Sequence, residues 1–548
     1  MADTTATGAP APEESAIQTD YKIGQDNIRG QIGPFGLDIH NPVFAISGVS
    51  VIIFVIVTLL FPDTATGVFG AMMSWVTTRF DWFFILTANI FLVFAIFLAI
   101  SPYGKVRLGG PDAKPDFTTS GWLAMLFAAG MGIGLLFWSV GEPMTHFASS
   151  VAEDAGTPES WAPLGGMPGD VAGSARLGMA ATLYHWGLQA WAIYAVVALA
   201  LALFAFNKGL PLALRSAFYP IFGERVWGWT GHIIDTLAVL ATLFGLATSL
   251  GLGAEQINAG LNYLYGVPVN SFVKIVLIAV ITGVALTSVL RGLDGGVKLA
   301  SEINMALAFL LLLFVLFVGP TGAALSRVGT SVVDYFAYLP ALSMPFGRED
   351  ENYAQGWSSF YWAWWVSWSP FVGMFIARVS RGRTVREFIV CVMLIPSAVC
   401  IIWMSIFAGV AFDQYINDGY TAVADAALEV KLFEMFDVMP LAQLTSLIGI
   451  ILVAVFFITS SDSGSLVIDT ITAGGKDDGP IPQRVFWCIF EGLVAIALLL
   501  GGGLGALQSM VVTTGFPFAF VLLLMCVSIV MGLRSEPVVR DRRTPAAT

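Results

Sequence analysis

The chain contains twelve apolar stretches that could each cross a lipid bilayer as a helix, and this feature limits the possible folds most severely. The hydrocarbon core is about 30 Å thick, so a spanning helix needs about 20 mostly apolar residues. Only 12% of the 548 residues are charged, about half the share in a soluble domain. The sequence therefore predicts an all-α membrane protein with 12 transmembrane helices. The predicted spans are Val43–Phe61, Trp82–Ile100, Trp122–Trp138, Leu183–Phe206, Ile233–Gly253, Phe272–Leu290, Met305–Val318, Trp357–Ile376, Phe388–Phe407, Leu444–Ile458, Val485–Leu500 and Met510–Met531.

Basic residues divide unevenly between the loops that join these spans. An even number of spans leaves both termini on one side, and most of the 26 Lys and Arg fall on that side. Loops rich in Lys and Arg stay in the cytoplasm, so both termini are predicted to be cytoplasmic. We predict a disordered cytoplasmic tail over 1–40, a transmembrane domain over 41–533 and a short cytoplasmic C-terminal tail over 534–548. Two longer breaks, 141–178 and 319–356, separate predicted spans.

Composition and motifs exclude several functional classes. The formal net charge of −12 argues against nucleic acid as a partner. The sequence has no Ser-His-Asp, HExxH or phosphate-loop pattern, so we do not expect an enzyme. All four cysteines fall inside predicted spans without metal-ligand spacing, and we interpret them as small apolar core residues.

Two segments at membrane depth break the simple pattern of an apolar anchor. Residues 128–134 read AAGMGIG, and residues 360–371 read FYWAWWVSWSPF. Three glycines weaken a helix, and irregular backbone in a membrane is tolerated only against protein or a water-filled cavity. A broken helix together with an aromatic cluster therefore indicates a buried site for a small cation, as in a transporter.

Aromatic residues gather in two predicted spans, toward the middle rather than at the membrane interface. Aromatic packing between helices is one explanation. The other is a cage for a quaternary ammonium or sulfonium, which has no N–H to donate and can be held by ring faces. The fourth span contains Tyr184, His185, Trp186, Trp191 and Tyr194, and the eighth contains Trp362, Trp364, Trp365, Trp368 and Phe371.

Hydroxyl and ionisable side chains supply further candidates. Thr459 and Ser460 end the tenth span and could ligate sodium, which needs several oxygens, although bonding to the preceding helical turn explains them equally. Carboxylates within a membrane are candidate functional groups, although a place at a helix end accounts for Glu142 and Asp462. We interpret His185 as a buried, hydrogen-bonded residue, with a proton relay as the alternative. The four carboxylates are Glu142, Glu255, Asp462 and Glu491.

Setting the first two spans aside leaves ten, which divide into spans 3–7 and 8–12. The glycine cluster then opens the first half and the tryptophan cluster opens the second. Irregular segments at corresponding positions of two halves are typical of an inverted repeat with a binding site at the interface.

These motifs resemble the betaine–choline–carnitine transporter family over roughly residues 40–530. The resemblance implies a leucine-transporter-like 5+5 inverted repeat after two extra N-terminal helices. It also implies a homotrimer that contacts membrane lipid, in the bacterial plasma (inner) membrane. The matching segments are FAAGMGIG at 127–134, HW at 185–186, WAIY at 191–194, FYWAWWVSWSPF at 360–371, ARVSRGR at 377–383 and FITS at 457–460.

The same resemblance implies site residues. The substrate site would comprise Trp186, Trp191, Tyr194, Trp364, Trp365, Trp368, Ala129 and Ser249. One sodium ion would be bound by the carbonyls of Ala128, Met131 and Phe456 and by the hydroxyls of Thr459 and Ser460. A second sodium would use Thr242 and the ring of Phe371.

Two positions and the C-terminal tail distinguish this chain within the resemblance. Leu246 stands where sodium–betaine members carry a threonine, and leucine cannot ligate a hard cation, so Glu255 is the candidate for compensation. Gly134 stands at a position that resembles an aspartate in choline carriers, which favours a zwitterion such as betaine. The short C-terminal tail lacks the long basic helix of osmosensing members, which favours constitutive or nutritional uptake over osmotic gating.

The sequence therefore predicts a sodium-coupled symporter that imports a zwitterionic onium compound, with glycine betaine first and sodium as the coupling ion. Dimethylsulfoniopropionate, choline and carnitine are alternative substrates, and proton coupling is an alternative drive. A channel and a membrane sensor are the alternatives from other functional classes. A channel would need a continuous polar lining, whereas the third and eighth spans alternate glycine with bulky aromatics. A sensor would need a sizeable cytoplasmic output domain, which we do not expect in this chain. No cofactor is expected.

Overall fold

The computed structural model describes residues 17, 19–32, 35–129, 132–291, 297–476 and 478–537. The described part is almost entirely helical, and its only sheet has two strands. The helices are α1 Val43–Leu60, α2 Pro62–Ile100, α3 Thr119–Ala129, α4 Ile133–Val151, α5 Val171–Trp186, α6 Leu188–Ala202, α7 Tyr219–Phe222, α8 Trp229–Tyr265, α9 Ser271–Arg291, α10 Val297–Val318, α11 Thr321–Leu342, α12 Glu351–Tyr353, α13 Ser359–Val379, α14 Val385–Ile416, α15 Ala422–Asp425, α16 Lys431–Asp437, α17 Ala442–Thr472, α18 Ile481–Leu500 and α19 Gly503–Arg534.

The helical membrane protein predicted from the apolar stretches is confirmed. Within the described residues, ten helices are long and apolar enough to cross a membrane, or eleven if the bent pair α3 and α4 counts as one span. Each predicted span coincides with a helix or, for the third and fourth, with a pair of helices on either side of a break, and the eighth lies on α13. The helix α13 is rich in Trp, Tyr and Ser and is not among the ten. The number established for the described residues is therefore ten or eleven spanning helices, and the predicted twelve is not confirmed.

Helix breaks occur at the segments that the glycines mark. The axes of α3 and α4 are bent by 58° on either side of residues 130–132. A second break lies at Gly187, between α5 and α6, where an added Cβ would lie 2.6 Å from the Leu183 carbonyl oxygen. Glycine therefore permits a close approach of backbone there that any other residue would prevent.

Close helix packing follows from small residues, because in a membrane the association of helices depends on van der Waals contact. The helix α8 lies against α17 and α19. At Gly251 an added Cβ would lie 2.4 Å from the Leu507 side chain of α19, and at Gly260 it would lie 2.5 Å from the Phe433 ring. These glycines let α8 pack centrally between its neighbours.

The tail predicted to be disordered over 1–40 is partly ordered, and that prediction is wrong for residues 27–32 and 35–40. Strands β1 Asn27–Ile32 and β2 Phe35–His40 form an antiparallel hairpin. Asn27 Nδ2 donates to the Ala473 carbonyl at 2.8 Å, Lys476 pairs with Asp38, and Gln483 Oε1 accepts from the Asp38 backbone N–H at 2.6 Å. The hairpin is thus attached to the loop between α17 and α18, through contacts that are distant in sequence.

The two long breaks between predicted spans are also more helical than expected. Most of 319–342 forms α11, whose half-buried pattern comes from alternating apolar and polar faces. Residues 141–151 continue α4 and residues 171–178 begin α5, so the first break is reduced to 152–170.

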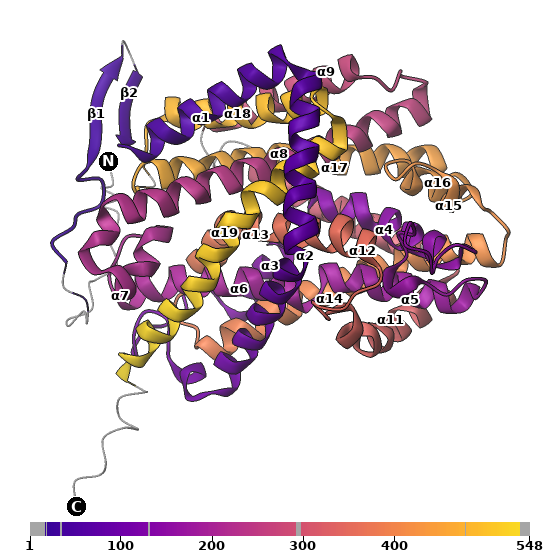
Figure 1. Ribbon diagram of the computed structural model, residues 1–548, viewed down its shortest axis with the longest axis horizontal. Coiled ribbons are helices and arrows are strands. Elements are labelled where there is room, and N and C mark those ends of the chain that lie inside the picture. The colour runs from indigo at the N-terminus through magenta and orange to yellow at the C-terminus, as the bar shows by residue number, and fades with distance from the viewer. Residues whose placement is uncertain are drawn as a thin grey trace, which may run out of the picture.

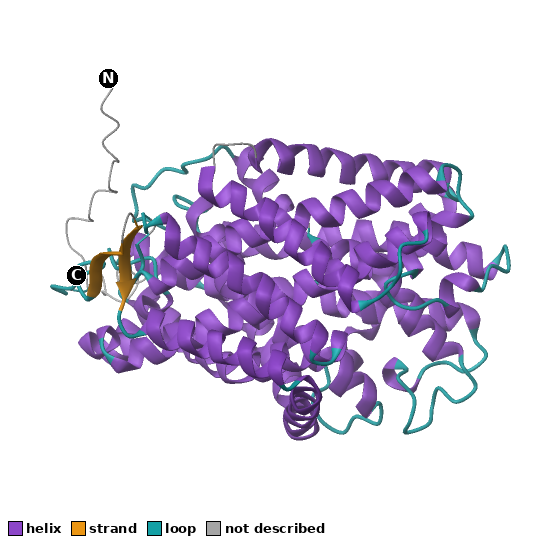
Figure 2. Ribbon diagram, turned by 90° about the horizontal axis from the view of Figure 1, so that it is seen from above, coloured by secondary structure: helices purple, strands orange, loops and turns teal. Residues whose placement is uncertain are grey.

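The bundle is elongated, and several long helices run between its two ends (Figure 1). The hairpin and the C-terminal end of α19 lie at one end, whereas α15 and α16 lie at the other. Seen from above, the hairpin projects from the edge of a continuous body of helices (Figure 2). The described chain therefore enters and leaves the bundle at the same end.

Candidate functional site

A cavity of about 310 Å³ lies in the centre of the bundle, where the broken helices meet α8, α13 and α17. Its lining includes most of the residues predicted from the sequence to bind substrate or sodium. Those lining residues are Ala128, Ala129, Trp186, Trp191, Tyr194, Ser249, Trp364, Trp365, Trp368, Phe371, Phe456, Thr459 and Ser460. Met131 and Gly130 lie outside the described residues.

Aromatic rings form one wall of the cavity, with Trp365 at its centre. The Trp365 ring centroid lies 5.5 Å from that of Trp186, 5.6 Å from Trp191 and 4.9 Å from Tyr194. The planes of these three rings are inclined to Trp365 by 81°, 63° and 57°. Rings at such angles present faces from several directions to one small space, which is the arrangement that holds a quaternary ammonium.

Hydrogen bonds between elements orient three of these indoles. Trp364 Nε1 donates to Ser249 Oγ at 3.2 Å, and Trp368 Nε1 donates to the Gly245 carbonyl at 3.0 Å, which ties α13 to α8. Trp186 Nε1 donates to Glu142 Oε2 at 2.9 Å, which ties α5 to α4. Ser249 therefore has a structural role in the site, as the hydrogen-bond acceptor that orients Trp364.

Hydroxyl groups form the opposite wall, on α17. Thr459 Oγ1 donates within its own helix, to the Val455 carbonyl at 3.1 Å and the Phe456 carbonyl at 3.2 Å. This is the bonding to the preceding turn that was one of the two explanations of the motif. A hydroxyl oxygen that donates its hydrogen retains lone pairs, so the contact is also compatible with a cation ligand.

The residues of the predicted second sodium site are not assembled in the cavity. Phe371 lines the cavity, but Thr242 does not, although its side chain is fully buried. Leu246 packs closely against Gly464. A Cβ added to Gly464 would lie 2.4 Å from the Cδ1 atom of Leu246. Glu255, the candidate for compensation, pairs with Lys274 at 2.6 Å and is not among the lining residues.

Gly134 lies where any side chain would meet the cage. An added Cβ would lie 2.8 Å from Trp186 Cη2 and 3.0 Å from Trp364 Cη2. Both distances are shorter than a normal carbon–carbon contact of about 3.5–4.0 Å. Glycine is therefore required for the two indoles to approach the second half of the broken helix, quite apart from any electrostatic role of the position.

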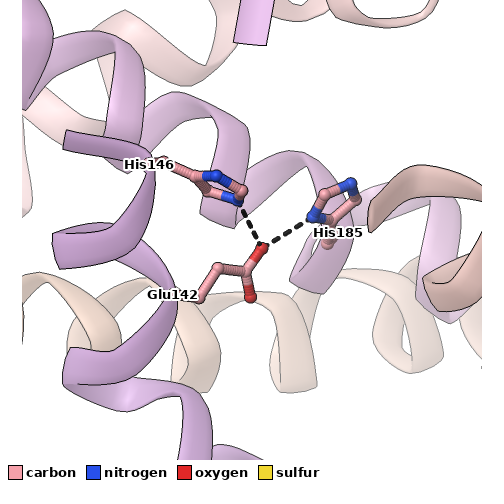
Figure 3. Close-up of side chains that lie close together, drawn as sticks. All are labelled: Glu142, His146 and His185. Carbon is pink, nitrogen blue, oxygen red and sulfur yellow. Dashed lines mark hydrogen bonds and ion pairs between the residues drawn. The ribbon is translucent and has the colours of Figure 1, made fainter. Parts of the chain in front are cut away.

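A buried polar cluster behind Trp186 was only partly predicted. Glu142, interpreted as a helix-end residue, lies within α4 with its side chain fully buried, and that interpretation is wrong. Its Oε1 atom lies 2.6 Å from His185 Nδ1 and 3.3 Å from His146 Nε2 (Figure 3). His185 is indeed buried and hydrogen-bonded, as interpreted. The i, i+4 spacing of Glu142 and His146 was a signal in the sequence that could have joined them.

A second pair of buried carboxylates lies on the far side of α17. Asp462 is in the interior of α17, not at a helix end as interpreted, and Glu491 is in α18. Ser461 Oγ donates to Glu491 Oε2 at 2.9 Å. Neither carboxylate lines the cavity, so neither contacts the site described above.

Comparisons with known proteins identify the family to which the chain belongs. A model of the betaine/carnitine/choline family transporters matches residues 42–538. A glycine betaine/proline/choline transporter of Vibrio parahaemolyticus is 61% identical over 96% of this chain and 96% of its own length. A glycine betaine transporter of Acinetobacter baylyi is 41% identical over 92% of this chain and 76% of its own length, and one of Bacillus subtilis is 43% identical over 87% and 91%. The chain is therefore a transporter rather than an enzyme, and it belongs to the betaine/carnitine/choline transporter family.

Proposed function

We propose that this protein is a sodium-coupled symporter that imports glycine betaine. The observation that carries the proposal is the aromatic wall, in which Trp186, Trp191 and Tyr194 surround Trp365 at centroid distances of 4.9 to 5.6 Å. A trimethylammonium group offers no hydrogen-bond donor and is recognised by ring faces. Several relatives are named as glycine betaine transporters, which supports the same substrate class here.

Among the alternatives, dimethylsulfoniopropionate presents a sulfonium to the same rings, and choline and carnitine present the same ammonium. Two relatives carry choline and proline in their names, and one of these also carries ectoine. Gly134 favours a zwitterion over choline, because it supplies no carboxylate to take the place of the anionic end that choline lacks or to repel the carboxylate of a zwitterion. The ranking therefore keeps glycine betaine first and choline among the alternatives.

Sodium coupling is proposed at a single site. The carbonyls of Ala128 and Phe456 and the hydroxyls of Thr459 and Ser460 belong to residues that line the cavity next to the helix break. Oxygen atoms from carbonyls and hydroxyls suit a hard monovalent ion. The carbonyl of Met131 completes the set implied by the family resemblance. A second sodium site is not proposed, since Leu246 is apolar and Thr242 lies outside the lining.

For the membrane arrangement we propose twelve crossings, a 5+5 inverted repeat of spans 3–7 and 8–12, cytoplasmic termini and a homotrimer in the bacterial inner membrane. The position of the hairpin and the end of α19 at one end of the bundle supports an even number of crossings (Figure 1). The bias of Lys and Arg toward that side supports a cytoplasmic location of the termini.

Uptake into proteoliposomes tests the proposal. Labelled glycine betaine, choline, carnitine and dimethylsulfoniopropionate are offered with an inward sodium gradient, with a proton gradient, and with neither. We expect glycine betaine to accumulate only with the sodium gradient. Accumulation driven by protons alone would overturn sodium coupling, and preferential uptake of another compound would replace glycine betaine as the substrate.

A further inference from the structure

The carboxylate of Glu142 lies behind the aromatic cage rather than in it, yet it contacts a cage residue directly. Its side chain is fully buried, and Oε2 accepts from Trp186 Nε1 at 2.9 Å and from the Tyr361 hydroxyl. Its other oxygen, Oε1, faces His185 and His146. Glu142 thus joins α4, which follows the broken segment, to α5 and α13, which carry the cage.

The contacts of the two histidines are compatible with an ionised carboxylate beside two neutral rings. An ionised carboxylate can only accept hydrogen bonds, so the ring nitrogen that each histidine turns toward it carries a proton. The opposite nitrogen of His185 lies 3.0 Å from the Ser358 hydroxyl, which can donate to it. The opposite nitrogen of His146 has no hydrogen-bond partner among the described residues. Two neutral histidines satisfy this geometry, and the cluster then keeps one negative charge.

A metal ion does not explain the cluster. The three ligand atoms lie within 4.8 Å of one another, but Oε1 and His185 Nδ1 are only 2.6 Å apart. Two ligands bound to one ion at about 2.0–2.2 Å each would stand farther apart than that. Oε1 faces the two histidines (Figure 3). Oε2 already accepts from the Trp186 N–H and the Tyr361 hydroxyl.

We propose that Glu142 is a positioning residue of the onium site, which fixes the Trp186 ring by its N–H and places a negative charge behind that ring. A hydrogen bond from a neutral donor to an ionised acceptor is stronger than one between neutral groups. The bond also draws the indole proton toward the carboxylate, which makes the ring face more negative and more attractive to a cation. The low dielectric of the buried site maintains this effect.

The inference rests on the proposed recognition of an onium group, and it makes a prediction that is specific to charge. Each ammonium ligand has a carbon counterpart of nearly the same shape, in which an uncharged quaternary carbon replaces the charged nitrogen: 3,3-dimethylbutanoate for glycine betaine and 3,3-dimethylbutanol for choline. The ratio of the two dissociation constants measures how strongly the site prefers the charge. Glu142 should contribute to this ratio, whereas a residue that only stabilises the fold should not.

The test is calorimetric titration of the purified full chain, in saturating sodium, with each ligand and its carbon counterpart. Glu142→Gln should raise the Kd of glycine betaine and of choline by about tenfold or more, choline more than betaine because choline has no carboxylate to be repelled. The Kd of 3,3-dimethylbutanol should change by less than about twofold, and the Kd of 3,3-dimethylbutanoate should stay the same or fall, because its carboxylate is no longer repelled by Glu142. The matched control is Glu491→Gln, which alters an equally buried carboxylate away from the cavity and should leave both ratios unchanged.

Trp186→Phe provides an independent arm, because it keeps an aromatic ring but removes the N–H that Glu142 holds. Trp186→Phe should raise the Kd of the ammonium ligands selectively. Adding Glu142→Gln to Trp186→Phe should raise that Kd by a smaller factor than Glu142→Gln does in the unsubstituted protein. Additive losses in this double variant, or equal losses for ammonium and carbon ligands, would overturn the inference. If the unsubstituted protein did not prefer ammonium over carbon ligands, the proposed function would fail instead.

Discussion

The two walls of the central cavity are held by different kinds of contact. The indoles of Trp186, Trp364 and Trp368 donate to Glu142, Ser249 and the Gly245 carbonyl, all of them on other helices. On the opposite wall, Thr459 donates only to carbonyls of its own helix. The aromatic wall therefore depends on how helices pack together, whereas the hydroxyl wall is local to α17. Changes to the first should act on substrate affinity, and changes to the second on the ion.

The largest effect is expected at the centre of the aromatic wall. Trp365→Leu keeps apolar bulk but removes the ring face that Trp186, Trp191 and Tyr194 surround. The loss of about 2 kcal/mol for one desolvated cation–π contact raises Kd about 30-fold, and uptake at low substrate should be lost. Trp362→Leu, on the same helix but outside the lining, is the control. Glycine betaine binding within about twofold of the parent would remove Trp365 from the cage.

The next effect tests the closeness of Gly134 to the cage. From charge alone, Gly134→Asp is expected to confer choline transport. The contacts of 2.8 and 3.0 Å to Trp186 and Trp364 change that expectation, since any side chain must first displace an indole. Gly134→Ala should therefore weaken every onium ligand by about tenfold. Normal glycine betaine binding by Gly134→Ala would show that the rings move freely, and Gly134→Asp would then test the charge alone.

A smaller and more selective effect is expected on the hydroxyl wall. Thr459→Ala combined with Ser460→Ala removes two oxygen atoms and should raise the sodium concentration for half-maximal uptake by about tenfold. The glycine betaine Kd at saturating sodium should change little. Ser463→Ala, which also lines the cavity on α17, serves as the control. An unaltered sodium dependence in the double variant would place the ion elsewhere.

The smallest effect is expected at Glu255. Its carboxylate pairs with Lys274 at 2.6 Å and does not line the cavity, so Glu255→Gln should leave the sodium dependence of uptake unchanged. Lys274→Met should likewise leave it unchanged, apart from any loss of thermal stability. A shift in sodium dependence on Glu255→Gln would return this residue to the list of candidate ion ligands.

The aromatic residues that line the cavity could be singled out from the sequence because they lie in two compact motifs. Trp364, Trp365 and Trp368 share a broad face of one helix, and Trp186 precedes the glycine at which α5 ends. The predicted spans were recognisable for a similar reason, since each is a continuous apolar run. Both kinds of pattern are local, and a single helix contains all the evidence for them.

Features that depend on contacts between distant segments were not predictable in this way. Glu142 stands 44 positions before Trp186 and 219 before Tyr361, so no spacing rule joins the three. The hairpin at residues 27–40 is held by residues more than 400 positions away. The clash at Gly134 likewise depends on where two other helices place their indoles. Composition alone made the N-terminal segment look disordered, because its partners lie near the other end of the chain.

The attachment of the hairpin has a practical consequence for protein engineering. Its contacts with Ala473, Lys476 and Gln483 make residues 27–40 part of the membrane body rather than a removable leader. Affinity tags and fluorescent fusions are therefore best joined ahead of Asn27. Shortened variants for crystallisation should keep Asp38, since losing it would remove the hydrogen-bonded ion pair that joins the hairpin to Lys476, in the turn between α17 and α18.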